Sequence, residues 1–428
     1  MRILHTSDWH LGASLGPASR ESEHAAFLAW LAETLVSQAV DVLVVAGDVF
    51  DHAQPSSEAQ GMYYRFLAQV SFARLASGGA YPRHVVVTGG NHDSASRLDA
   101  PREVLGALSV TVVGGYDPAR EADLLVPIWS HPGGSILGVV AAVPYVNEYR
   151  LGVSARAASP QTAAVEAFAG LYGRLADAAT AAYPGVPRVT TGHLTCSTRQ
   201  AVTARPEADA LAISAEDFPL PVHCVGTLGA LPPTIFDPRW DYVALGHIHR
   251  CMAPEAGRVW YSGTPVAMGF TELSPRQVLL VDLDGPGSAP RVTGLTPPAL
   301  RRLERLRGPP DTVLARLSEL ARSETPLAPL IDLTFEVPHY QANLRNRTQR
   351  ALEGLVRPPI VVGLRQESDA QEPDEDSDVS EEPMPAARLT PWEIFERAWM
   401  RRHGPPPGPD IRSAFEALAS TPVESPEA

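Results

Sequence analysis

Residues 2–12, Arg-Ile-Leu-His-Thr-Ser-Asp-Trp-His-Leu-Gly, begin with a short run of the β type that ends at polar residues. Runs of the same kind occur at 40–46, 84–88, 188–191 and 242–245. Helical periodicity fills the next two intervals, over 25–38 and 58–75. Strands that alternate with helices predict a layered α/β domain with parallel pairing. In such sheets, the loops that follow the carboxyl ends of the strands collect the active-site groups.

The rest of the chain divides by pattern. Residues 124–146 predict an antiparallel strand pair, 163–183 a helix and 277–283 a strand. A smaller module follows, with helices over 313–322 and 344–356 and strands over 330–337 and 360–364, which fits a compact α+β unit. We therefore expect four parts: a main domain at 1–290, the small module at 291–365, an acidic disordered linker at 366–388, and a helical region at 389–428.

Charge and composition exclude several kinds of chemistry. The net charge is -14, and all 35 basic residues are Arg, because the chain contains no Lys. A P-loop and a Schiff-base mechanism both require Lys, so neither is present. The acidic total argues against a nucleic-acid partner, but residues 366–387 carry nine carboxylates, and the remaining 406 residues have a net charge of only -5.

Three cysteines, no signal peptide and no long apolar run favour a reducing compartment without a membrane span. We expect the protein in the cytoplasm, near the nucleoid.

Polar blocks follow five of the predicted strands. They are Ser7-Asp8-Trp9-His10, Gly47-Asp48-Val49-Phe50-Asp51, Gly90-Asn91-His92-Asp93, Gly192-His193 and Gly246-His247-Ile248-His249. Each block supplies oxygen or imidazole donors of the kind that divalent metals accept. Asp-x-His and His-x-His spacing on an extended segment directs both side chains of a pair to one side. A single block is weak evidence, since a lone Gly-Asn-His-Asp is usually a turn; five in this order point to a dinuclear phosphoesterase site.

The five blocks resemble the signature of the calcineurin-like metallophosphoesterases, and residues 1–365 as a whole look like the SbcD family of bacterial nuclease subunits. The resemblance implies a four-layer β-sandwich flanked by helices, with the small module as a DNA-capping domain. It also implies two divalent metal ions, with Mn²⁺ expected. Asp48 would bridge them. The first metal would be held by Asp8, His10, Asp48 and His249, and the second by Asp48, Asn91, His193 and His247.

The resemblance further makes His92 the residue that faces the phosphate and protonates the leaving oxygen. Asp93 would orient His92 through a hydrogen bond. Archaeal relatives have a second active-site histidine at the position of Asp51, so the role of Asp51 stays open, with an outer-sphere role the first candidate. His52 reads as a loop histidine. Cys196, close to His193, reads as a small buried residue.

The C-terminal region predicts two short amphipathic helices. Thr390-Pro391-Trp392-Glu393 is a capping box that opens the first, which runs to about 402, and the second covers 411–419. Two such helices cannot bury their aromatic faces well on each other. They either fold back on the main body or dock on another protein. The resemblance implies the second, with an SbcC-type coiled-coil ATPase as the partner. The docking residues would be Trp392, Phe395, Trp399, Phe415 and Leu418.

Five arginines lie between 338 and 365 against one acid, and Arg345, Arg347 and Arg350 are the candidate DNA contacts. A solvated helix face remains the alternative. The resemblance implies a homodimer within a heterotetramer that acts in DNA repair and recombination, as an ATP-dependent double-strand exonuclease and a single-strand or hairpin endonuclease. Two alternatives stay open: a phosphatase or cyclic-nucleotide phosphodiesterase of the same fold, and a scaffold that has kept the fold without activity.

Overall fold

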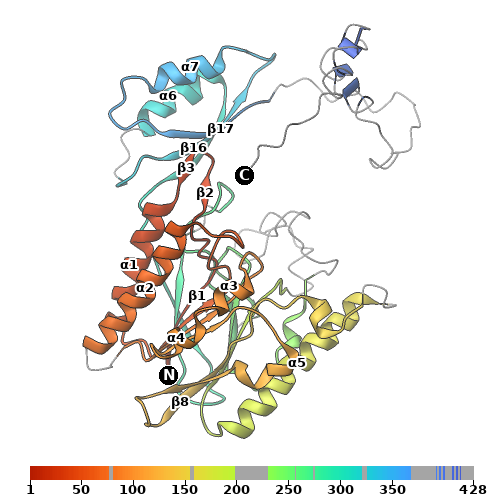
Figure 1. Cartoon of the computed structure of the whole chain (residues 1–428). Coiled ribbons are helices and arrows are strands. Elements are labelled where there is room, and N and C mark those ends of the chain that lie inside the picture. Colours follow the sequence, from red (N-terminus) through yellow and green to blue (C-terminus); the bar gives the residue numbers. More distant parts are fainter. Residues whose placement is uncertain are drawn as a thin grey trace, which may run out of the picture. The chain divides into compact units, whose positions relative to one another are not determined.

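A computed structural model describes residues 1–76, 81–154, 159–197, 230–255, 257–272, 275–320 and 325–367, together with isolated positions between 392 and 415. The chain forms two units, Met1–Asp369 and Ala370–Ala428. The first unit contains two large sheets and a smaller third one (Figure 1).

The first sheet is mixed. Its order is β14 (Arg291–Leu295), β13 (Val278–Asp282), β1 (Arg2–Thr6), β4 (Val42–Ala46), β5 (His84–Thr88) and β6 (Val110–Val113). Strands β1, β4, β5 and β6 are parallel, whereas β13 and β14 are antiparallel additions. The N-terminal strand therefore lies in the middle of the sheet.

The second sheet has the order β11 (Met252–Glu255), β12 (Val259–Tyr261), β10 (Tyr242–Gly246), β9 (Arg188–His193), β8 (Ile136–Ala141) and β7 (Leu125–Trp129). Its centre, β8 to β12, is parallel, and β7 pairs with β8 in the expected antiparallel manner.

The two sheets pack face to face, because alternate residues of their strands are apolar on both sides. Along β4, Val42 and Val44 join the core between the sheets, and Leu43 and Val45 join the core under the helices. On β10, Tyr242 and Val243 divide in the same way. Helices α1 (Glu21–Ser37) and α2 (Ser57–Ala76) cover the first sheet, and α5 (Pro160–Ala182) covers the second (Figure 1). The predicted four-layer α/β sandwich is confirmed.

Short elements complete this part of the chain. They are the hairpin strands β2 (Ser14–Leu15) and β3 (Ala18–Ser19), the helices α3 (Ala95–Asp99) and α4 (Arg102–Gly106), and the 3-10 helices η1 (Pro118–Leu124), η2 (Glu148–Leu151) and η5 (Pro233–Ile235).

The small module is a βαβαβ unit: β15 (Leu303–Gly308), α6 (Pro310–Leu320), β16 (Leu330–Glu336), α7 (Leu344–Leu352) and β17 (Ile360–Glu367). All three strands are parallel, so the expected α+β unit is in fact an α/β one. Strand β15 was not predicted, because charged side chains at Glu304, Arg305 and Arg307 hide a strand at the edge of the sheet. Leu15 and Ala18 of the β2–β3 hairpin pack against Leu330 and Val362 of this module.

Two expected boundaries move. Strand β14 belongs to the first sheet, so the main domain extends past the expected limit at 290. Gln366 and Glu367 lie in β17, so the linker cannot begin at 366. The remainder of the expected linker, 368–388, lies outside the described residues.

In the C-terminal unit, the described aromatic rings contact one another. The ring centroids of Phe395 and Phe415 are 4.8 Å apart, and those of Trp392 and Phe415 are 5.4 Å apart. The two segments thus pack together more closely than expected, although all three rings stay half-buried. Leu418 lies outside the described residues. Among the helices that the structure describes, none combines the length and apolar character needed to cross a bilayer.

Candidate metal centre

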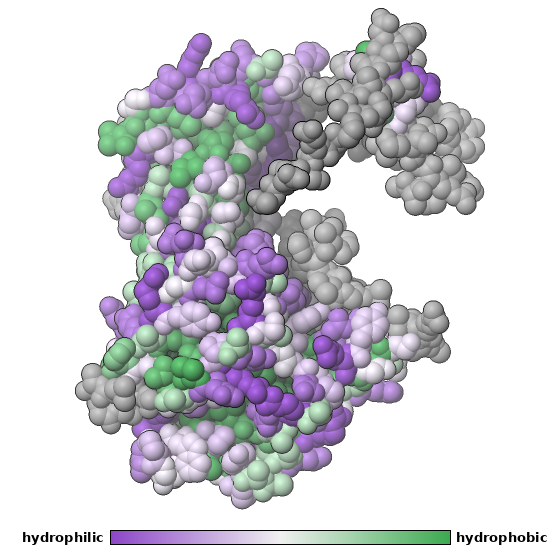
Figure 2. Space-filling model, viewed as in Figure 1, coloured by the Kyte–Doolittle hydropathy of each residue, from purple (hydrophilic) through white to green (hydrophobic). Residues whose placement is uncertain are grey.

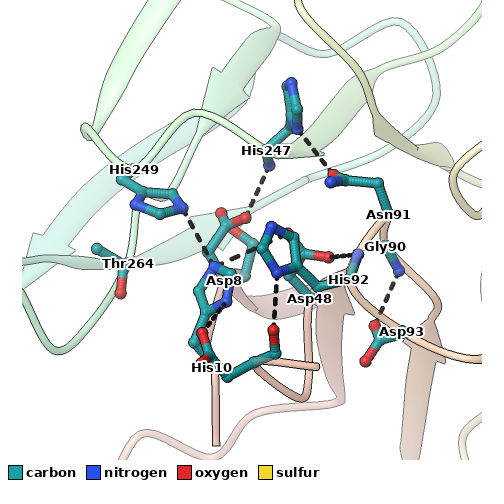
Figure 3. A network of polar contacts seen from close by, with 12 residues as sticks. Asp8, His10, Asp48, Gly90, Asn91, His92, Asp93, His247, His249 and Thr264 are labelled. Carbon is teal, nitrogen blue, oxygen red and sulfur yellow. Dashed lines mark hydrogen bonds and ion pairs between the residues drawn. The ribbon is translucent and has the colours of Figure 1, made fainter. Parts of the chain in front are cut away.

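The five polar blocks meet where β1, β4 and β5 of one sheet and β9 and β10 of the other reach their carboxyl ends (Figure 3). Four of these residues have positive φ angles: Asp8 at 52°, His10 at 47°, Asp48 at 50° and His247 at 91°. Such angles are uncommon for residues other than Gly, and backbone strain of this kind clusters at functional sites. The fold therefore holds these four side chains in place at a cost in backbone energy.

Close backbone approach explains two of the glycines. A Cβ atom on Gly90 would lie 2.1 Å from Oδ1 of Asp48, and one on Gly246 would lie 1.9 Å from the carbonyl oxygen of Ala46. The second contact joins β10 to β4 across the two sheets, so a larger side chain would separate the strands that carry the site.

Asp8, His10 and His249 form the first donor group, with one potential ligand atom of each within 4.8 Å of the others. Nε2 of His10 lies 3.2 Å from Nε2 of His249 and 3.8 Å from Oδ2 of Asp48. Ser7 donates a 2.5 Å hydrogen bond to Oδ2 of Asp8. Imidazole nitrogens and carboxylate oxygens thus converge on one point.

Asp48, Asn91, His193 and His247 form the second group. Oδ1 of Asn91 lies 3.0 Å from both Nε2 of His193 and Nδ1 of His247. Oδ2 of Asp48 is 3.2 Å from Nε2 of His193. Asp48 is therefore close to donors of both groups, the position that a bridging carboxylate requires.

Burial and mutual charge set the ionisation of this group. Burial opposes the charge on both Asp48 and His193, but their attraction for each other holds the pKa of Asp48 below its ordinary value and that of His193 above it. Burial, with the neighbouring His193, lowers the pKa of His247 to about 3. Asp48 is thus a carboxylate and His247 a neutral imidazole at neutral pH, the forms that bind metals.

Outer hydrogen bonds orient two of the imidazoles. Nδ1 of His193 donates to the carbonyl oxygen of Ala46 over 2.9 Å, and Nδ1 of His249 lies 2.7 Å from Oε1 of Glu272. Such partners direct the other ring nitrogen, Nε2, to the centre. The other oxygen of Glu272 accepts a hydrogen bond from the backbone of Met268. Glu272 was not predicted from the sequence, because it lies 23 residues after His249 in a loop without a motif.

His92 lies at the edge of the centre. Its backbone N–H donates to Oδ1 of Asp48 over 2.8 Å, and its Nδ1 donates to the carbonyl oxygen of Asp51 over 2.8 Å. Its ring stands perpendicular to that of His10, with centroids 4.9 Å apart. The hydrogen bond at Nδ1 leaves Nε2 as the ring nitrogen that can act on a substrate.

Asp93 differs from the expectation. Its carboxylate accepts hydrogen bonds from the backbone N–H groups of Val49, Phe50 and Gly90, at 2.9 to 3.0 Å. It thus connects the loop after β4 to the loop after β5, while the carbonyl of Asp51 orients His92. The sequence could not show this, because the three N–H groups belong to the backbone.

Asp51 lies between two histidines. Its Oδ1 is 3.4 Å from Nδ1 of His10, and its Oδ2 is 3.0 Å from Nε2 of His52. Although burial opposes its charge, the neighbouring His10 keeps the pKa of Asp51 below its ordinary value. Asp51 therefore faces the outer nitrogen of His10.

The donor set fits divalent cations. Two buried carboxylates, four imidazoles and one amide oxygen converge, and two of the imidazoles have their outer nitrogens held by oxygen acceptors.

Comparison with known proteins agrees with this geometry. Residues 1–251 match the family model described as calcineurin-like phosphoesterase, and residues 299–403 match the one described as type 5 capsule protein repressor C-terminal domain. A Rhodobacter capsulatus protein, named as the SbcD subunit of the nuclease SbcCD, is 35% identical over 93% of this chain and 94% of its own. The Escherichia coli protein of the same name is 30% identical over 87% of this chain and 86% of its own. The chain belongs to the SbcD family of calcineurin-like phosphoesterases.

The candidate DNA contacts of this SbcD-family chain lie apart from the centre, on α7 of the small module. Arg345 and Arg350 are exposed, but Arg347 pairs with Asp311 at 2.5 Å. Figure 2 shows hydrophilic residues gathered over the α7 edge of this module. Cys196 is 1% exposed, as expected of a small buried residue.

Proposed function

We propose that this chain is the nuclease subunit of an SbcCD-type complex and hydrolyses DNA phosphodiester bonds with two divalent cations, Mn²⁺ in the first place. The observation that carries the proposal is the pair of donor groups that share Asp48. Membership of a phosphoesterase family, and the printed names of its relatives, support it.

We assign Asp8, His10, Asp48 and His249 to one cation, and Asp48, Asn91, His193 and His247 to the other. Cations held there supply positive charge to the scissile phosphate and acidify a water molecule for in-line attack. The chain itself holds the donors in place: Ser7 fixes Asp8, Ala46 fixes His193, and Glu272 fixes His249.

His92 is assigned to the leaving group. Asp51 accepts the proton of Nδ1, so the ring presents Nε2 toward the substrate side. A protonated Nε2 then donates its proton to the oxygen that departs as the phosphodiester bond breaks. Asp51, in turn, faces His10 and thereby supports both histidines.

The small module is assigned to DNA. Arg345 and Arg350 are exposed on α7 and suit phosphate contacts, whereas Arg347 is engaged by Asp311. Limiting the assignment to the two exposed arginines gives a testable difference between members of one short helix.

The C-terminal unit is assigned to an SbcC-type coiled-coil ATPase. Trp392, Phe395 and Phe415 contact one another yet stay half-buried, which leaves aromatic surface for a partner. The chain has no Lys for a P-loop, so ATP hydrolysis falls to the partner. We also propose a homodimer within a heterotetramer, in the cytoplasm near the nucleoid.

The deciding experiment is a cleavage assay on linear duplex, hairpin and single-stranded DNA, with Mn²⁺ or Mg²⁺, with and without the partner ATPase. We expect Mn²⁺-dependent release of nucleotides from the duplex only with partner and ATP, and cutting of hairpins and single strands. Hydrolysis of an aryl phosphate ester or a cyclic nucleotide, with no action on DNA, would instead identify a phosphatase or phosphodiesterase. An Asp48→Ala chain that still supports DNA processing would identify a scaffold.

A further inference from the structure

A third group of metal-binding side chains lies beside the two groups assigned above. It consists of Asp51, His52 and His92, each of which offers one ligand atom within 4.8 Å of the other two. The closest pair is Oδ2 of Asp51 and Nε2 of His52, 3.0 Å apart. Neither His52 nor this carboxylate oxygen has a role in the proposed hydrolysis.

The other atoms of this group are already engaged in ways that leave the three donors available. Nδ1 of His92 donates to the carbonyl oxygen of Asp51, so its lone pair is on Nε2. Oδ1 of Asp51 is directed to His10, and Oδ2 is directed to His52. The side chain of His52 is 78% exposed, so it can rotate by the small amount that a shared ligand requires.

The chemistry of this group differs from that of the dinuclear centre. Two imidazoles, one carboxylate and an open side toward solvent make up the three-ligand set of many zinc sites, in which a water completes a tetrahedron. Ligand atoms around a tetrahedral zinc ion lie roughly 3.4 Å apart, a spacing that these side chains can adopt without movement of the backbone. Nitrogen donors also favour Zn²⁺ over Mn²⁺.

We propose that Asp51, His52 and His92 form a third cation site, which takes Zn²⁺, and that zinc bound there inhibits the nuclease. The inhibitory part rests on the proposed function, because it requires that His92 act on the leaving group. Zinc at this site occupies the lone pair of Nε2, so His92 can no longer carry the proton that the leaving oxygen needs. The dinuclear centre keeps all seven of its donors.

The first test counts metal and needs no activity. The full chain, wild type or His52→Ala, is dialysed against excess Zn²⁺, and bound metal is measured by mass spectrometry. We expect three ions per wild-type chain and two per His52→Ala chain. His131→Ala, which removes an exposed histidine from a turn of the second sheet, is the matched control and should bind three. Three ions in His52→Ala, or two in the wild type, would overturn the site.

The second test measures cleavage of single-stranded DNA by the Mn²⁺-loaded chain as Zn²⁺ is added. We expect His52→Ala to keep the wild-type rate without zinc and to need about 10-fold more zinc or more for half inhibition, at least the effect of losing an outer partner of a metal ligand. Equal inhibition of both chains would assign the effect to zinc in the dinuclear centre and overturn the regulatory part. A wild type that binds three ions but cuts no DNA would refute the nuclease assignment and leave the site.

Discussion

Nδ1 of His249 lies 2.7 Å from Oε1 of Glu272, a carboxylate that the loop after the second sheet brings to the edge of the metal centre. Arg276 holds the same arrangement from outside, since it donates to the carbonyl oxygen of His249 and lies 3.5 Å from Oε2 of Glu272. The carboxylate thus fixes both the tautomer and the direction of the ring.

Removal of this carboxylate should weaken metal binding. We expect Glu272→Ala to lower the affinity for Mn²⁺ by about 10–100-fold, because the ring of His249 loses its orientation, and Glu272→Gln to lower it less, because an amide oxygen still accepts the hydrogen bond. Isothermal titration calorimetry with Mn²⁺ measures this. Glu319→Ala, an exposed residue of α6, is the control. Wild-type affinity in Glu272→Ala would contradict the role.

His92 should be separable from metal binding. We expect His92→Ala to reduce DNA cleavage by at least about 100-fold, the contribution of a positioned general acid, while two cations still bind. Cleavage is followed on single-stranded DNA and metal content by mass spectrometry. Full activity in this variant would refute the assignment of His92.

Gly90 should tolerate no side chain. A Cβ atom there would lie 2.1 Å from Oδ1 and 2.3 Å from the backbone nitrogen of Asp48, so we expect Gly90→Ala to lower the free energy of unfolding by about 1–3 kcal/mol and to weaken metal binding. Gly173→Ala in α5 is the matched control. Its Cβ would meet nothing within 4 Å, and removing a helical glycine should stabilise the fold by about 0.5–1 kcal/mol. Chemical denaturation of both variants measures the difference.

Chelation should destabilise the main domain. Asp8 and Asp48 are buried, at 0% and 2% exposure, and cations neutralise them only in the folded state. At a Mn²⁺ concentration 1,000 times its Kd, we expect about 4 kcal/mol of added stability. Thermal unfolding in Mn²⁺ and in EDTA tests this, and the gap should vanish in Asp48→Ala. A melting temperature indifferent to both metal and chelator would argue against the centre.

Deletion of residues 389–428 should separate assembly from catalysis. We expect the shortened chain to cut single-stranded DNA at the wild-type rate but to lose co-purification with the ATPase, because the aromatic surface of Trp392 and Phe415 is gone. The double variant Trp392→Ala, Phe415→Ala in the full chain is the finer test. Unchanged complex formation in both would refute the docking assignment.

Much of the fold follows from the sequence. The strand pattern of alternating apolar residues, as in Val42 to Val45, reports burial on both faces, and it predicted the central strands and the layered sandwich. Strand β15 was missed because charges interrupt its pattern at Glu304 and Arg305.

The candidate site divides in the same way. Residues at strand ends could be found because Asp, Asn and His stand there in short blocks. The hydrogen bonds of Asp93 could not, since its partners are backbone N–H groups that carry no sequence signal. Glu272 could not either, since its partner His249 is distant along the chain.

The β2–β3 hairpin has a mechanical consequence. It begins four residues after His10, and its Leu15 and Ala18 pack on Leu330 of the small module. A tilt of that module that preserves this apolar contact must pull on the segment leading from His10. The hairpin is thus a short lever, and force applied to the far end of the molecule by DNA or a partner reaches the first donor group through four residues of chain.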